Sequence, residues 1–86
     1  MASVKLLYFA WVREKVGHGD DTFELPEAVA SVTDLIQWLR LQGPEYDAAF
    51  ENESAIRVAI NQEHVTHDAL LAGAKEIAFF PPVTGG

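Results

Sequence analysis

The 86-residue sequence contains no cysteine, and this absence removes several kinds of chemistry. Without a thiol the chain cannot use a cysteine nucleophile, form a thiolate metal site or carry sulfur as a persulfide. It also cannot form the disulfides that stabilise many small secreted domains, which fits a reducing compartment. No N-terminal stretch has the pattern of a secretory signal, so we expect a cytoplasmic protein.

Basic residues are also scarce, since 6 Lys and Arg stand against 13 Asp and Glu, for a formal net charge of −7. A surface of this sign repels a phosphate backbone, so we expect no nucleic-acid partner. No apolar run approaches the roughly 20 residues of a membrane span, so we expect no membrane insertion. The chain has no glycine-rich phosphate loop either, so any ATP chemistry must come from another protein.

What is present is one small domain of strands with one clear helix. Residues 4–10 and 75–80 are apolar runs rich in strand formers, while residues 21–25 and 56–61 alternate in polarity, and a tight turn leads to Val65. The first two of these strands in chain order are expected to form a hairpin with a long connection. The last strand is apolar on both faces, so we expect it inside the sheet, beside the first strand.

The strongest local signal predicts a helix over residues 32–42. Ser31 can cap its N-terminus, and Asp34 can complete a capping box. Gly43 is expected to end the helix in a left-handed conformation. A shorter helical turn is expected around residues 46–50. The apolar stripe of the main helix consists of Val32, Leu35, Ile36 and Leu39.

This order of elements predicts an α+β fold, in which a mixed five-stranded sheet packs on one main helix. That arrangement is the β-grasp, or ubiquitin-like, fold. We expect the β-grasp domain to cover residues 1–80 and a flexible, extended C-terminal Gly-Gly tail to cover residues 81–86.

The tail has an unusual composition for a chain end. Pro81 and Pro82 cannot donate to a β-ladder, so they end the strand and direct the chain outward, where six residues can reach about 20 Å. Gly85 and Gly86 have no Cβ, so their backbone can enter a channel too narrow for other residues. The reactive group at the end is the α-carboxylate of Gly86.

A carboxylate becomes a good electrophile only when it is activated, for example as an acyl-adenylate. Sulfur can then displace AMP and leave a thiocarboxylate. Because the chain has no cysteine, its C-terminus is the one place where it can carry sulfur in this way. The alternative is a frayed end or a cloning remnant, but neither explains two prolines directly after a strand.

Three stretches resemble the family of small, sulfur-carrier subunits of molybdopterin synthase, and the resemblance spans essentially the whole chain. They are LLYFAWVRE (residues 6–14) followed by Gly17, the Asn61-Gln62 turn, and IAFFPPVTGG (residues 77–86). The last stretch is the most specific. One departure lies at residues 73–75, a turn where the family often has an acidic residue after the glycine.

The resemblance implies that Gly86 is adenylated by a ubiquitin-activating-like adenylyltransferase, which uses ATP, and is then converted to a thiocarboxylate (1-thioglycine). It also implies that the tail enters the large catalytic subunit in a heterotetramer. There the sulfur passes to cyclic pyranopterin monophosphate to form the dithiolene of molybdopterin. The chain would be a non-catalytic subunit that binds no cofactor or metal. By the same resemblance the carrier residues are Gly85 and Gly86, and the partner-binding residues are Phe80, Pro81, Pro82, Val83 and Thr84.

Two other functions share this terminal chemistry. One is another ubiquitin-like sulfur carrier, of the thiamine or tRNA thiolation type, although thiamine-type carriers usually lack the Phe-Phe-Pro-Pro-Val stretch. The other is a protein modifier conjugated to lysines through Gly86. Lysine adducts would favour the modifier, whereas a stable complex with a pterin-binding subunit would favour the synthase.

Other candidate residues have simpler explanations. His64 and His67 are expected to be surface residues, because their spacing on a strand or turn does not converge on a metal and no third ligand is evident. Glu51 and Glu53 are expected in a polar loop rather than in an acid–base pair.

The segment after the first strand leaves one question open. Arg13 and Glu14 are expected to form a solvated pair in a loop, or a partner contact. Trp11 either packs on the edge of the core or serves an interface, and the sequence favours neither.

Overall fold

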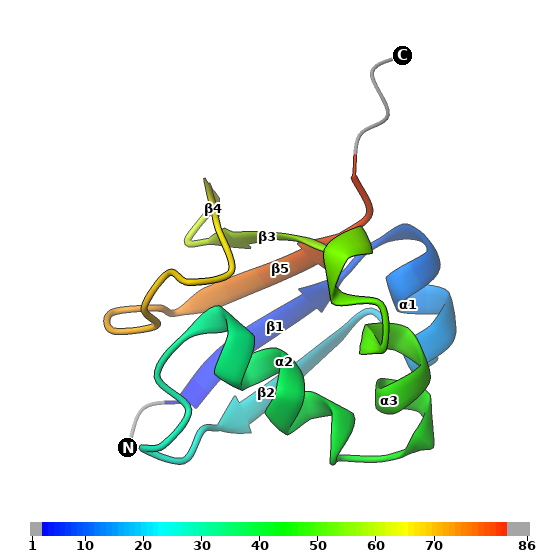
Figure 1. Ribbon diagram of the computed structural model, residues 1–86, viewed down its shortest axis with the longest axis horizontal. Helices are drawn as coiled ribbons and strands as arrows, with labels where there is room; N and C mark the ends of the chain where they lie inside the picture. Colours follow the sequence, from blue (N-terminus) through cyan, green and yellow to red (C-terminus); the bar gives the residue numbers. More distant parts are fainter. Residues whose placement is uncertain (1–2, 83–86) are drawn as a thin grey trace.

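The computed structural model describes residues 3–82, and these form the mixed five-stranded sheet that the sequence predicts (Figure 1). The strand order is β2-β1-β5-β3-β4. The strands are β1 (Ser3–Tyr8), β2 (Asp20–Glu24), β3 (Arg57–Ile60), β4 (Glu63–Val65) and β5 (Glu76–Phe80). The predicted α+β class is therefore confirmed.

The last strand lies in the middle of the sheet, as predicted. β5 pairs with β1 in parallel and with β3 antiparallel, while β2 and β4 pair antiparallel at the two edges. The turn between β3 and β4 uses Asn61 and Gln62 with φ angles of 50° and 71°. The Asn61 side chain accepts hydrogen bonds from the backbone N–H groups of Lys75 and Glu76, at 2.9 and 3.1 Å. This turn therefore fixes the start of β5.

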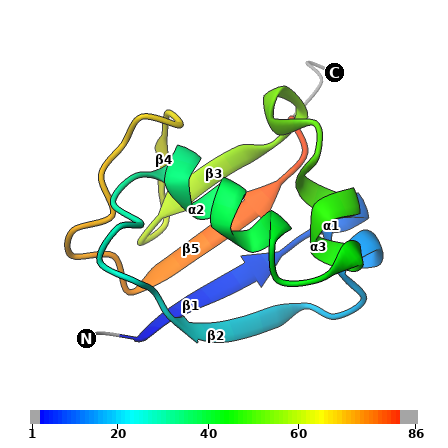
Figure 2. The ribbon, with the colours of Figure 1, turned by 60° about the horizontal axis from the view of Figure 1, so that its bottom comes forward.

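Three α-helices and one short 3₁₀-helix accompany the sheet in the described part of the chain. They are α1 (Ala10–Val16), α2 (Val32–Arg40), α3 (Pro44–Phe50) and η1 (Glu53–Ala55). α2 lies across one face of the sheet (Figures 1 and 2). Its predicted capping box is confirmed, because the Ser31 hydroxyl accepts from the backbone of Asp34 while the Asp34 carboxylate accepts from the backbone of Ser31.

Two local predictions are wrong. The connection between β1 and β2 is not a loop, because residues 10–16 form α1, which ends at a left-handed Gly17. Val12 and Val16 lie four residues apart and are both buried, so tertiary packing stabilises this short helix. Gly43 is not left-handed either, since its φ of 163° is extended and it precedes Pro44, the first residue of α3. A residue before proline favours extended backbone, which explains the difference.

The core lies between the sheet and α2, α3 and α1. Its largest fully buried side chains include three aromatic rings, from Tyr8, Phe50 and Phe79. Phe79 contacts both others, with ring centroids 6.2 Å from Tyr8 and 5.0 Å from Phe50. Within residues 3–82, no helix has the length and apolar character needed to cross a lipid bilayer.

Candidate functional site

The candidate site is the tail root, which we define as Phe80, Pro81 and Pro82. These residues follow the buried Phe79 directly, and all three are half-buried. Of the predicted site residues, Val83, Thr84, Gly85 and Gly86 lie outside the described residues. The central strand, β5, ends at Phe80, and the described chain continues through the two prolines (Figure 1).

The tail root is firmly held because of the neighbours of β5. Ile77 and Phe79 on β5 are fully buried, and β5 is hydrogen-bonded to a strand on each side. The last residue of the strand, Phe80, still pairs with Arg57 of β3. Strand order therefore continues to the first proline, where the ladder must stop because proline has no N–H.

Side chains alternate between the two faces of the sheet along β5, which places Phe80 of the tail root on the face opposite the core. Ile77 and Phe79 face the core, whereas Ala78 and Phe80 are half-buried on the opposite side of the sheet. Leu7 of β1 pairs with Ala78, so it lies on that side too. We call this surface the open face and define it by Leu7, Phe9, Ala78 and Phe80.

Phe9 was not among the predicted site residues, yet it is the most exposed part of the open face. It follows β1 directly, and its backbone N–H donates to the carbonyl of Phe79 at 3.1 Å. Its side chain is 49% exposed, which is unusual for a large aromatic residue. The signal in the sequence was the alternation itself, since Leu7 and Phe9 share one face of the first strand.

The residues after Phe9 do not form the loop that was predicted. Arg13 and Glu14 are exposed residues of α1 and not of a loop, and among the described residues no ion pair joins them. Trp11 packs against the core and is half-buried, and the Nζ atom of Lys15 lies 5.8 Å from its ring. Trp11 is therefore a packing residue at the core's edge.

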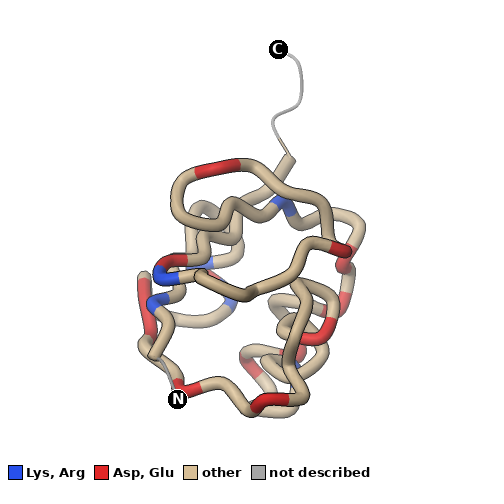
Figure 3. The backbone as a smooth tube through the Cα atoms, turned by 90° about the vertical axis from the view of Figure 1, so that its left-hand side faces the viewer, with Lys and Arg blue, Asp and Glu red and all other residues tan. Residues whose placement is uncertain are grey.

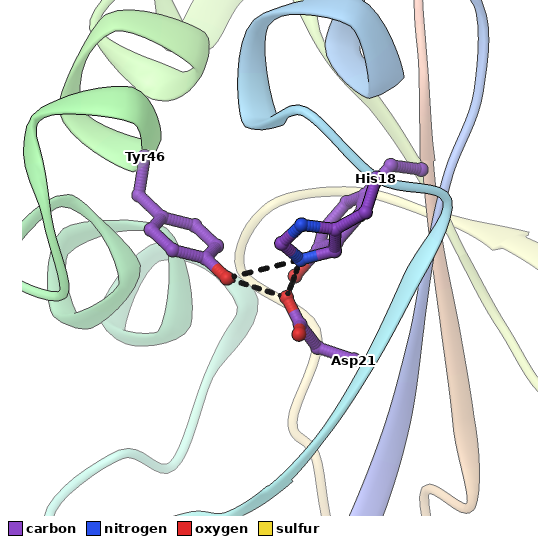
Figure 4. A network of polar contacts seen from close by, with 4 residues as sticks. His18, Asp21 and Tyr46 are labelled. Carbon is purple, nitrogen blue, oxygen red and sulfur yellow. Dashed lines mark hydrogen bonds and ion pairs between the residues drawn. The ribbon is translucent and has the colours of Figure 1, made fainter.

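On the core side of the sheet, a polar cluster joins β1, β2, α3 and the connection between α1 and β2 (Figure 4). One oxygen of Asp21, on β2, accepts from the hydroxyls of Tyr46 and Tyr8 at 2.6 and 2.9 Å. It also lies 2.8 Å from Nε2 of His18. We call these four residues the Asp21 cluster. Tyr8 is stacked on Phe79, so the cluster braces the strand that leads to the tail.

The Asp21 cluster also changes the acidity of its members. Partial burial opposes ionisation of Asp21, but hydrogen bonds from Tyr46, His18 and Tyr8 outweigh it, so the pKa of the carboxyl lies below its ordinary value. Burial, followed by the hydrogen bond to Asp21, raises the pKa of Tyr8 and that of Tyr46. The cluster therefore holds one carboxylate and two neutral phenols at neutral pH, which is a bracing arrangement. The sequence reasoning missed it because no short motif links its members.

The remaining candidates lie apart from the tail root or have structural partners. Nε2 of His67 donates to the carbonyl of Ile56 at 2.8 Å, and the ring of His64 lies 5.1 Å from that of Phe80. Glu51 follows α3 and Glu53 begins η1. Among residues 3–82, no three His, Asp or Glu side chains converge in a way that could hold a metal ion.

Charged residues are spread over the whole domain. Acidic residues are found all round the tube, with fewer basic residues among them (Figure 3). Arg40 is paired with Asp47 at 2.7 Å, whereas Arg57 is exposed opposite Phe80. The tail root therefore combines apolar and aromatic groups with one nearby cation, which suits a protein partner better than a polyanion.

Comparison with known proteins adds independent information. The model of the ThiS family matches residues 6–86. The molybdopterin synthase sulfur carrier subunit of Escherichia coli (strain K12) is 40% identical over 83 residues, which cover 96% of this chain and 99% of that protein. The subunit of the same name from Haemophilus influenzae is 35% identical, with the same coverage of both chains.

A solved structure agrees with the fold. The crystal structure of SAMP1 from Haloferax volcanii matches with a TM-score of 0.72 and 26% sequence identity. The match covers 99% of this chain and 100% of SAMP1. The predicted β-grasp, ubiquitin-like fold is therefore confirmed.

Proposed function

The chain belongs to the ThiS family, and from this membership we propose that it is the sulfur carrier subunit of a molybdopterin synthase. Relatives of that name match 96% of the chain, and the family model extends to residue 86. The main structural support is the tail root, where the central strand ends at two prolines beside the open face. This arrangement offers a terminus on a rigid base, as a carrier needs.

The proposed chemistry takes place on the carboxylate of Gly86. One of its oxygens attacks the α-phosphate of ATP in an adenylyltransferase, and pyrophosphate leaves. Sulfide, as HS⁻, then adds to the acyl carbon, AMP leaves with the electron pair of the broken C–O bond, and loss of the sulfur-bound proton gives the thiocarboxylate. ATP is thus bound and used by the activating enzyme, and this chain needs no cofactor of its own.

The loaded tail then delivers its sulfur inside a second protein, which we propose to be the large catalytic subunit. The arm of residues 81–86 reaches about 20 Å when extended, which is long enough to enter a deep pocket of a partner protein. The acceptor is cyclic pyranopterin monophosphate, and the complex is a heterotetramer. Val83, Thr84 and Gly85 would form the inserted part of the arm, next to Gly86.

The open face is the surface on which we propose that the partner rests. Phe9 and Phe80 belong to the open face, and aromatic residues of this kind are enriched at the centres of interfaces. Arg57 pairs with Phe80 along the strand edge and supplies a charge at the rim. A partner that covers this surface also directs the tail into its own active site.

Intact mass spectrometry tests the proposed function. The protein is incubated with ATP, an adenylyltransferase of the ubiquitin-activating type and a sulfur donor, next to a variant that lacks Gly86. We expect a mass gain equal to one oxygen replaced by sulfur, and no gain in the truncated variant. An unmodified wild-type mass would contradict the proposal.

A second experiment distinguishes the synthase subunit from a protein modifier. The thiocarboxylated protein is mixed with the large subunit and cyclic pyranopterin monophosphate, and molybdopterin is measured. We expect molybdopterin to form and the original mass of the carrier to return. Adducts between Gly86 and lysines of other proteins, with no molybdopterin, would instead identify a modifier.

A further inference from the structure

The junction between β1 and α1 contains a backbone conformation that is uncommon for its residue. Ala10, the first residue of α1, has a φ angle of 53°. This is the left-handed region, where the Cβ of an L-residue approaches its own backbone and where glycine or asparagine is usually found. Such outliers persist only where surrounding contacts hold them, and they gather at functional sites.

The contacts that hold Ala10 come from both sides of the junction. Before it, the backbone N–H of Phe9 donates to the carbonyl of Phe79 at 3.1 Å. After it, the carbonyl of Phe9 accepts from the N–H groups of Val12 and Arg13, at 3.1 and 3.4 Å. Val12 is fully buried. The chain must therefore turn from strand to helix within one residue, and a left-handed Ala10 makes that turn.

The turn has a direct effect on Phe9. Both backbone groups of Phe9 are hydrogen-bonded, and the chain leaves the sheet immediately afterwards, so the side chain remains on the open face with about half of its surface exposed. Tyr8 pairs with Phe79, so Phe9 is the next residue after the paired part of β1, just as Phe80 is the next residue along β5. The backbone that carries this large aromatic ring is thus held in place before any partner arrives.

We propose that Ala10 is a positioning residue, whose left-handed backbone fixes Phe9 as a preordered anchor for the large subunit. This inference rests on the proposed function, because it concerns the partner that receives the tail. A ring that is ordered in the free protein loses less conformational entropy on binding, so affinity depends on the rigidity of the junction as well as on the ring itself.

Three variants of the junction separate this role from a structural one. Ala10→Gly removes the steric cost but gives the junction more freedom. Ala10→Asn keeps a side chain that tolerates left-handed backbone, and an adjoining cavity of about 460 Å³, lined in part by Ala10 and Arg13, has room for it. Phe9→Ala removes the anchor. Ala28→Gly is the matched control, since Ala28 is exposed and lies in the connection after β2, and its φ is not positive.

The dissociation constant for the purified large subunit, the unfolding midpoint in urea and the steady-state constants for molybdopterin formation are measured for each variant. We expect Ala10→Gly to be at least as stable as wild type but to bind about threefold to tenfold more weakly. With the carrier as varied substrate, its KM should rise while kcat at saturation stays the same. Phe9→Ala should bind more weakly still, and Ala10→Asn and Ala28→Gly should bind within about twofold of wild type.

Other outcomes would overturn the inference. Wild-type affinity in Ala10→Gly would show that the junction does not position the anchor, and wild-type affinity in Phe9→Ala would show that no anchor exists. Equal weakening in Ala10→Asn and Ala10→Gly would show that affinity does not depend on the rigidity of the left-handed backbone, because asparagine keeps a Cβ and tolerates that conformation. The intact-mass experiment on Gly86 does not involve this junction, so failure of the proposed function remains distinguishable from failure of this inference.

Discussion

The two faces of β5 differ in a way that explains how one strand both stabilises the domain and presents its terminus. Ile77 and Phe79 are fully buried against the helices, whereas Ala78 and Phe80 are half-buried on the open face. The core face holds the strand in register up to its last residue. The open face leaves apolar surface beside the tail root, which a monomer does not need for its own stability. Neighbouring residues of one strand therefore serve different purposes.

The largest expected effect is the loss of the core face. Phe79→Ala removes a ring that contacts Tyr8 and Phe50, so we expect the free energy of unfolding to fall by about 3–5 kcal/mol. Urea denaturation followed by circular dichroism measures this change. A loss below about 1 kcal/mol would mean that the core relaxes around the missing ring and that Phe79 does not hold the strand.

The Asp21 cluster braces the same face, and its removal should have a smaller effect. Asp21→Ala leaves the buried hydroxyl of Tyr8 without its carboxylate acceptor, so we expect a loss of about 1–3 kcal/mol in urea denaturation. Asp20→Ala is the matched control, because Asp20 is its exposed neighbour on the same strand. Equal effects of the two substitutions would show that the carboxylate acts only through net charge.

The cluster also predicts a pH dependence. The pKa of Asp21 in the folded protein lies below its ordinary value of 3.8, so its contribution to stability is present above that pH and is lost as the pH falls further. The difference in unfolding free energy between wild type and Asp21→Asn should therefore shrink as the pH falls from about 5 to below the ordinary carboxyl pKa. Urea titrations across this range measure it, and a constant difference would contradict the assignment.

The smallest effect on stability is expected on the open face. Phe80→Ala should change the free energy of unfolding by no more than about 0.5–1 kcal/mol, since the side chain is only half-buried. The same substitution should weaken binding of the large subunit about tenfold or more, which calorimetry can measure. Phe79→Ala is the comparison variant. A larger loss of stability in Phe80→Ala than in Phe79→Ala would contradict the assignment of the two faces.

Features of the sequence that act locally predicted most of this fold. The capping box at Ser31 and Asp34, the tight turn at Asn61 and the apolar run of β5 each carry their own signal, and each is confirmed. The central position of β5 followed from its two apolar faces. The tail was identified in the same way, from two prolines and two glycines in a fixed order.

Features that depend on distant contacts were missed. α1 is too short to be stable alone, and its formation depends on packing of Val12 and Val16 against the core. The Asp21 cluster joins β1, β2, α3 and the connection at His18, so only the folded chain brings its members together. Phe9 was assigned to a strand, whereas its exposure results from the turn at Ala10 that follows it.

The parallel pairing of β1 with β5 has a consequence for the synthesis of the protein. During translation the first strand is made early, but its central neighbour β5 is made after the other four strands, so the pairing of Lys5 with Glu76 must wait for them. A prematurely terminated chain lacks both the strand that closes the sheet and the terminus that would be activated. Closure of the sheet therefore depends on synthesis of the segment that also leads to the tail root.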